Sequence, residues 1–123
     1  EAGAEEAFEQ ALATGREFDY PDVIARALTG KSQLALRRDD VEAATSLSEE
    51  AVQAGKRARK RRIYADALAM QSEVFAKAGK HAEAEETWQN AKQLYALLRL
   101  PQAEQLPAWI STEDTTQIKE DQN

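Results

Sequence analysis

Few residues in this sequence have the types and spacing that catalysis requires. His81 is the only histidine and cysteine is absent, so neither a histidine-rich metal site nor a Cys/His nucleophile can form. No glycine-rich phosphate loop and no HExxH motif occurs. A carboxylate site stays open, although the glutamates recur at helical spacing beside alanines, as solvated helix faces do. We expect a protein that is not an enzyme and has no metal or cofactor, with His81 a solvated first-turn residue.

The most prominent charged feature is the run KRARKRR at residues 56–62. Its basic residues are Lys56, Arg57, Arg59, Lys60, Arg61 and Arg62. Because the net charge is −6 and the run adds six positive charges and no acid, the rest of the chain sums to −12. The run could favour a helix C-terminus and keep a turn soluble, or bind an acidic protein segment, the chain's own tail being one candidate. Nucleic acid, phosphate or nuclear-import recognition is a third reading, disfavoured because no aromatic residue interleaves the run.

Length and composition favour one all-α domain. The chain has 123 residues, is rich in Ala, Glu, Gln, Leu, Lys and Arg, and contains three prolines and five glycines. No apolar run approaches the roughly 20 residues that cross a bilayer, so we expect no membrane insertion. The absence of cysteine is compatible with a reducing compartment. We expect an intracellular soluble protein, cytoplasmic or nuclear, and a part of a longer protein because the chain starts at Glu1 inside a repeat.

Apolar spacing predicts five helices. They cover residues 4–18, about 22–37, 40–55, 63–78 and 81–98. Asp39 or Asp40 can cap the third helix, and Gly79 suits the left-handed residue that follows the fourth. Residues 101–110 have room for a short helical turn at most. We therefore predict a helical domain at 1–110 and a polar acidic tail, frayed or extended, at 111–123.

An offset of forty residues relates these helices to one another. Alanines recur at this offset as Ala4, Ala44 and Ala84, and again as Ala11, Ala51 and Ala91. Phe8 and Trp88 lie between them in two of the copies, where we expect both rings to fill the space beside the small residues. A small side chain at a helix crossing lets two axes approach to about 8 Å. The period therefore predicts pairs of antiparallel helices stacked into an array.

These residues resemble the tetratricopeptide family. The first copy of the motif is Leu28, Ser32, Ala35, Asp39, Asp40, Ala44, Ser48 and Ala51, and the second is Leu68, Ser72, Phe75, Gly79, Lys80, Ala84, Trp88 and Ala91. The resemblance covers residues 4 to about 100 and implies a superhelix of helix pairs. The period exceeds the family's usual 34 residues by six, which is similar to the long-helix variants of bacterial signalling regulators and kinesin light chains. A HEAT-like array, whose period is also near forty, is the alternative fold.

The resemblance implies a concave groove lined by the first helix of each pair. Its residues here would be Arg26, Thr29, Gln33, Arg37, Asp66, Met70, Glu73 and Lys77. Such a groove would bind a peptide or helix of another protein, which makes the chain an interaction module of a larger regulator or scaffold. A chaperone C-terminus is not the expected ligand, because Thr29, Gln33 and Met70 replace the family's clamp residues. A polyanion contact through residues 56–62 and an architectural spacer are the alternative functions.

The helix at 4–18 matches the second helix of a pair, and we expect it to be covered on one side only. Its apolar stripe is Ala4, Ala7, Phe8, Ala11 and Leu12. Repeat arrays protect such an end with a polar capping helix, and none is evident here. We therefore expect self-association of the chain through this N-terminal helix.

Overall fold

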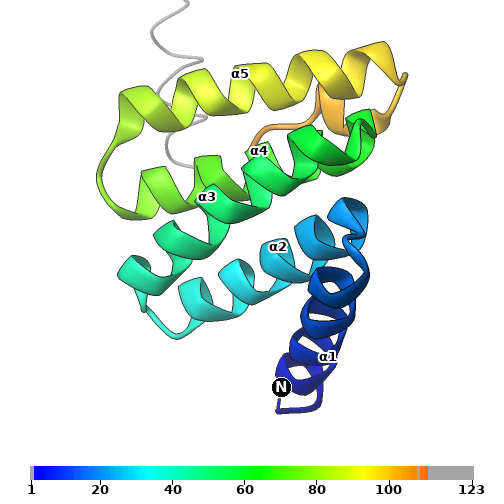
Figure 1. Cartoon of the computed structure of the whole chain (residues 1–123). Coiled ribbons are helices and arrows are strands. Elements are labelled where there is room, and N and C mark those ends of the chain that lie inside the picture. The colour runs from blue at the N-terminus through cyan, green and yellow to red at the C-terminus, as the bar shows by residue number, and fades with distance from the viewer. Residues whose placement is uncertain (1, 108, 111–123) are drawn as a thin grey trace, which may run out of the picture.

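The computed structural model describes residues 2–107, 109 and 110, and this part of the chain is helical without strands. The helices are α1 (Ala2–Phe18), α2 (Pro21–Arg37), α3 (Val41–Ala58), α4 (Arg61–Lys77), α5 (His81–Leu97) and the 3-10 helix η1 (Pro101–Glu104). Consecutive helices run antiparallel and stack on one another (Figure 1). The all-α class and the five predicted helices are confirmed. The predicted tail at 111–123 lies outside the described residues.

The helices form two layers. In the inner layer α2 and α4 contact each other. In the outer layer the backbones of α1, α3 and α5 approach inner helices but not one another within the described chain, although side chains of α1 and α3 meet in an ion pair between Arg16 and Glu50. Because α1 and α5 do not meet, the stack is open rather than closed into a bundle (Figure 1). The inner face of α2 and α4 is therefore free of a further helix from the described chain.

Small residues set the distance between the stacked helices. Ala44, Ala51, Ala84 and Ala91 have no solvent-accessible surface, as their recurrence predicts. A Cβ atom added at Gly15 would lie 2.9 Å from Cγ1 of Ile24, which is tighter than real Cβ contacts, and one at Gly55 would lie 3.2 Å from Cα of Tyr64. These two contacts are related by the forty-residue offset. Each copy thus brings the end of an outer helix directly against the start of the next inner helix.

The turns have a shorter period than the helix pairs. Every residue with a positive φ in the described chain lies twenty positions from the next, namely Asp19, Asp39, Arg59, Gly79 and Arg99. Each follows a helix, where a left-handed residue ends the helical hydrogen bonding. Sequence reasoning identified Gly79 alone, because glycine is the strongest signal for a left-handed residue, aspartate is a weaker one and arginine gives none. The helix and its turn, twenty residues long, are therefore the structural unit.

The chain leaves the repeat after α5. Tyr95 occupies the position of Gly15 and Gly55, and its buried ring leaves no room for the same close helix approach. Its hydroxyl donates a hydrogen bond of 2.6 Å to Oδ1 of Asp66, and burial raises the pKa of Tyr95. The segment after α5 then turns back: η1 packs on α5, and Nε1 of Trp109 donates to Oγ of Ser72 at 3.2 Å. This segment covers part of the stack's C-terminal end.

Trp88 tests the importance of packing between α4 and α5. Its ring is 8% exposed and lies tilted against Tyr95, with 6.4 Å between the ring centroids. We expect Trp88→Ala to lower the free energy of unfolding by about 3–5 kcal/mol in urea denaturation, because a large cavity would remain. Leu97→Ala is the control, since Leu97 is 66% exposed and should change stability little. A small effect at Trp88 would contradict the packing described here.

Arg99 tests the left-handed turns. A side chain with a Cβ atom is strained at a φ of 57°, and Arg99 forms no ion pair with described residues. We expect Arg99→Gly to stabilise the chain by up to about 1 kcal/mol and to raise the thermal midpoint. Gly79→Ala should have the opposite effect, because Gly79 has a φ of 81°. A lower midpoint for Arg99→Gly would show that its side chain contributes more than the strain costs.

Candidate partner-binding groove

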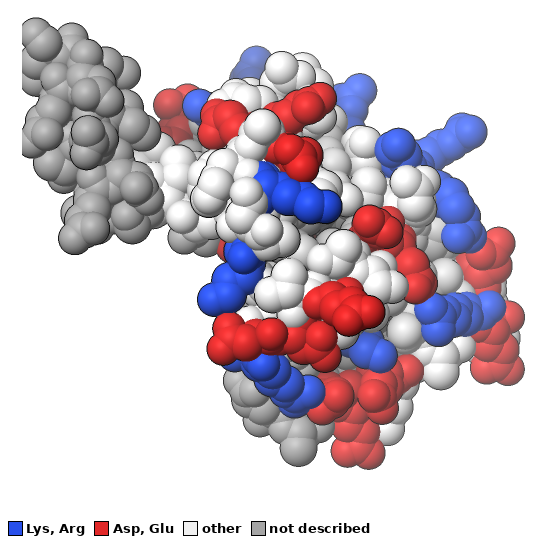
Figure 2. Space-filling view, turned by 90° about the vertical axis from the view of Figure 1, so that its left-hand side faces the viewer, with Lys and Arg blue, Asp and Glu red and all other residues white. Residues whose placement is uncertain are grey.

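The predicted groove residues lie on the inner helices, and five of the eight line two hollows. Arg26, Thr29 and Asp66 line one hollow, and Glu73 and Lys77 line the other. Gln33 and Arg37 are exposed on α2 outside both hollows. Figure 2 shows basic and acidic side chains interspersed over the side of the molecule that carries the α2–α3 and α4–α5 turns.

The assignment of Met70 to the groove surface is wrong. Its side chain is 6% exposed and packs with Ala44 and Val74 in a small apolar cluster, which Ala35 and Leu36 partly cover. Met70 lies at the middle of α4, where this helix rests on α2, and burial of an apolar side chain there stabilises the contact of the inner helices. Met70 therefore packs beneath the surface of the groove, and its side chain is too buried to contact a ligand.

We call the first hollow the proximal hollow. It has a volume of about 510 Å³ and is lined by Phe8, Arg26, Thr29, Gly30, Arg62, Ile63 and Asp66. The half-buried ring of Phe8 lies directly against the backbone of Gly30, where an added Cβ would be 2.3 Å from Cζ of the ring. Asp66 is held by Tyr95, and its Oδ2 lies 3.9 Å from Nε of Arg62. The proximal hollow thus combines one aromatic ring with fixed charges of both signs.

We call the second hollow the distal hollow. It has a volume of about 400 Å³ and is lined by Leu36, Glu73, Ala76, Lys77, His81 and Trp109. Leu36, Ala76 and Trp109 supply its apolar surface, while Nζ of Lys77 lies 3.3 Å from Oδ1 of Asp39 at its edge. Leu36 and Trp109 were not predicted here, and His81, expected to be only a solvated first-turn residue, is exposed and also lines the hollow. Trp109 could not have been found, because it reaches α4 from a segment outside the repeat.

Glu73 is the titrating group of the distal hollow whose pKa is shifted. Its carboxyl group is half-buried between the inner helices, and burial raises its pKa above the ordinary value, while the charge of Arg37 acts in the opposite direction. Glu73 is therefore a partly desolvated carboxyl group in the lining of the distal hollow.

The basic run is partly neutralised by the chain itself. Nη2 of Arg57 lies 2.6 Å from Oδ1 of Asp19, and Nζ of Lys60 lies 3.0 Å from Oδ2 of Asp22. The hydrogen bond from Lys60 lowers the pKa of Asp22. With Arg62 near Asp66, three of the six basic residues have acidic partners within the chain. The remaining three, Lys56, Arg59 and Arg61, form no ion pair with described residues.

The predicted contact face of α1 is only partly exposed. Ala4 and Ala7 are exposed and Ala11 is half-buried, whereas Leu12 is 5% exposed and belongs to the core. At the C-terminal end of α1, the exposed rings of Phe18 and Tyr20 stack with 5.9 Å between centroids. Self-association through α1 stays a prediction.

The described residues contain no group of three or more His, Asp or Glu side chains placed to hold a metal ion. None of their helices is long and apolar enough to cross a membrane. Comparisons of the chain with protein-family models, with curated proteins and with solved structures find no match.

Glu73 gives a test of the distal hollow that depends on pH. Since its folded-state pKa is raised, the folded state binds the proton more tightly, and stability falls as pH rises from 4.5 through the raised pKa. We expect Glu73→Gln to raise the thermal midpoint at neutral pH, and the difference from the unmodified chain to disappear below pH 4.5. Glu86→Gln on exposed α5 is the control. A lower midpoint for Glu73→Gln at neutral pH would mean that the attraction to Arg37 outweighs the lost hydration.

Proposed function

We propose that this chain is a non-catalytic protein-interaction module of the tetratricopeptide kind, within a larger regulator or scaffold. It binds a peptide or helix of another protein along the inner face of α2 and α4. The distal hollow carries this proposal, because Leu36, Ala76 and Trp109 offer apolar surface in a recess whose edge bears charged side chains. Recognition grooves for peptides and helices combine apolar recesses with charged edges in this way.

The charges of the inner face favour an acidic partner segment. Basic side chains outnumber acidic ones there, although the whole chain has a net charge of −6. The basic residues are Arg26, Arg37, Arg62 and Lys77, and the acidic residues are Asp39, Asp66 and Glu73. Arg62 is paired with Asp66, and Lys77 is paired with Asp39. Complementary charge would orient a segment along the groove and speed its association, while an apolar side chain in the distal hollow would supply affinity.

The alternative functions have less support. A polyanion contact through residues 56–62 would use a run of which half is already paired with acids of the chain. An architectural spacer would need no recess on the inner face, and the two hollows are then without a use. The spacer is the function that would be indicated if the following experiment finds no partner at the inner face.

The test is to obstruct the distal hollow without disturbing the fold. A photo-crosslinking residue is placed at Lys77 in the full-length protein, in its native cell, and the crosslinked partner is identified. We expect Ala76→Glu to abolish this crosslink, because a carboxylate would fill the apolar recess, while circular dichroism stays helical. Ala96→Glu introduces the same change on the exposed side of α5 and should leave the crosslink intact.

Two results would contradict the proposal. A crosslink that survives Ala76→Glu would mean that the partner does not occupy the distal hollow. No crosslink from Lys77, together with a partner captured from the control position at Ala96, would place the interaction on the outer helices and leave the inner face as a spacer.

A further inference from the structure

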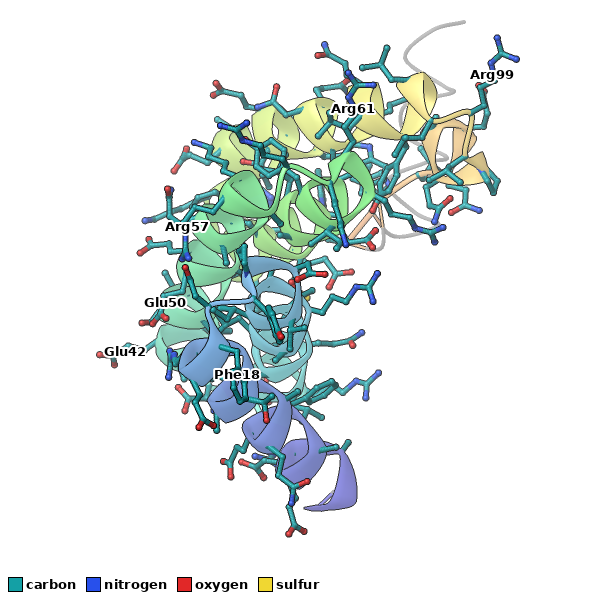
Figure 3. All side chains as sticks on the ribbon, turned by 45° about the vertical axis from the view of Figure 1, so that its right-hand side comes forward. Phe18, Glu42, Glu50, Arg57, Arg61 and Arg99 are labelled. Carbon is teal, nitrogen blue, oxygen red and sulfur yellow. The ribbon has the colours of Figure 1, made fainter. Side chains whose placement is uncertain are left out.

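The interval between the outer helices α1 and α3 is bridged by the chain's own charges. We call it the first crevice; it has a volume of about 660 Å³ and apolar side chains of Ile24, Leu28 and Ala54. Nη2 of Arg16 on α1 lies 3.1 Å from Oε2 of Glu50 on α3. Arg57, at the end of α3, is paired with Asp19 in the turn after α1. Figure 3 shows Glu50 and Arg57 projecting from the same side of the stack. Both cations of the first crevice thus meet a carboxylate.

The corresponding positions between α3 and α5 carry different charges. Forty residues on, Lys56 replaces Arg16, but Asn90 replaces Glu50, so the cation is kept and its acid is lost. Arg59 replaces Asp19 and Leu97 replaces Arg57, so an ion pair becomes a cation and an apolar side chain. Leu97 is 66% exposed, the highest value among the large exposed apolar residues. The second interval therefore keeps basic residues and has none of the acids that neutralise the first.

A recess concentrates this charge. It has a volume of about 310 Å³ and is lined by Gly55, Lys56, Arg59, Lys60, Arg61 and Tyr64. Lys60 is paired with Asp22, whereas Lys56, Arg59 and Arg61 have no acidic partner among the described residues. We call this recess the outer basic site. The ring of Tyr64 and three cations without an acidic partner among the described residues match an oxyanion-bearing ligand.

We propose that the outer basic site is a second interaction surface, which binds an acidic segment of a partner polypeptide. Carboxylates of the segment pair with Lys56, Arg59 and Arg61, which line the recess. Nucleic acid fits less well, because it requires several phosphate contacts, whereas this site offers three cations without an acidic partner among the described residues and the chain has a net charge of −6. This surface is formed by the end of α3 and the start of α4, and it shares no lining residue with the proximal or the distal hollow.

The binding test uses the whole chain and a short fluorescent peptide that contains several glutamates. Fluorescence anisotropy measures affinity at low and at high salt, with the same peptide carrying Gln for Glu as the control ligand. We expect saturable binding of the Glu peptide that weakens with salt, because the ion pairs are exposed. The double variant Lys56→Gln and Arg61→Gln should weaken binding about tenfold. Ala76→Glu should leave it unchanged, which separates this site from the inner groove.

Substitution of Arg59 distinguishes a loss of peptide binding from a loss of folding stability. Arg59 has a φ of 55°, so Arg59→Gly should raise the thermal midpoint while it weakens peptide binding. Arg99→Gly is the matched control, since Arg99 has a φ of 57° and lies outside the site, and it should raise the midpoint without a change in affinity. Equal affinities of the Arg59→Gly variant and the unmodified chain would overturn the proposal.

Two competing occupants are distinguished with the same assay. A single-stranded oligonucleotide that displaces the peptide and binds more tightly than it would overturn the proposal in favour of nucleic acid. Replacing Glu113, Asp114, Glu120 and Asp121 by their amides tests the chain's own residues 111–123 as the occupant. A tenfold gain in peptide affinity on that replacement would overturn the partner assignment, and unchanged affinity supports it.

Discussion

The close approach of neighbouring helices is the constraint on which this structure depends. Fully buried alanines such as Ala44 and Ala84 remove side-chain volume where helices cross, and Gly15 and Gly55 bring the ends of outer helices onto the starts of inner ones. Because these residues recur at a fixed offset, the same crossing geometry recurs, and the helices stack into an open array. In a closed bundle, other helices would cover α2 and α4 on every side. In this array, no further helix of the described chain covers their inner face.

The sequence predicted the parts of the structure that follow from a repeated pattern. The helices and the buried alanines were predicted because burial at helical spacing leaves a periodic record in the chain. Met70 was wrongly assigned to the groove because the family pattern considers the position of a residue and not the size of its side chain. Burial of this long apolar side chain in the contact between α2 and α4 stabilises the fold more than exposure in the groove would. Trp109 reaches the distal hollow from outside the repeat, so no periodicity points to it.

The end of the array shows how one residue changes what can pack next. At Gly15 and Gly55 the absence of a side chain admits the following inner helix, and at Tyr95 a ring fills the equivalent place. The hydroxyl of Tyr95 then finds Asp66 on α4, which ties α5 to the inner face. Tyr95 blocks the close approach of a further inner helix, and the segment that carries Trp109 packs against α4 instead. The departure from the repeat thus supplies an aromatic wall of the distal hollow.

Charge in this chain has to be interpreted together with the fold. In the sequence, residues 56–62 are a uniform basic run, but helix stacking brings Arg57 and Lys60 to Asp19 and Asp22, nearly one helix pair earlier. Pairing across this distance depends on the superposition of successive turns, which local composition does not record. The run is consequently divided into basic residues that pair with acidic residues of the chain and basic residues that form no ion pair with the described residues. Only the second group can meet a ligand without first breaking an ion pair, and this difference favours the outer basic site as the place where the proposed acidic segment binds.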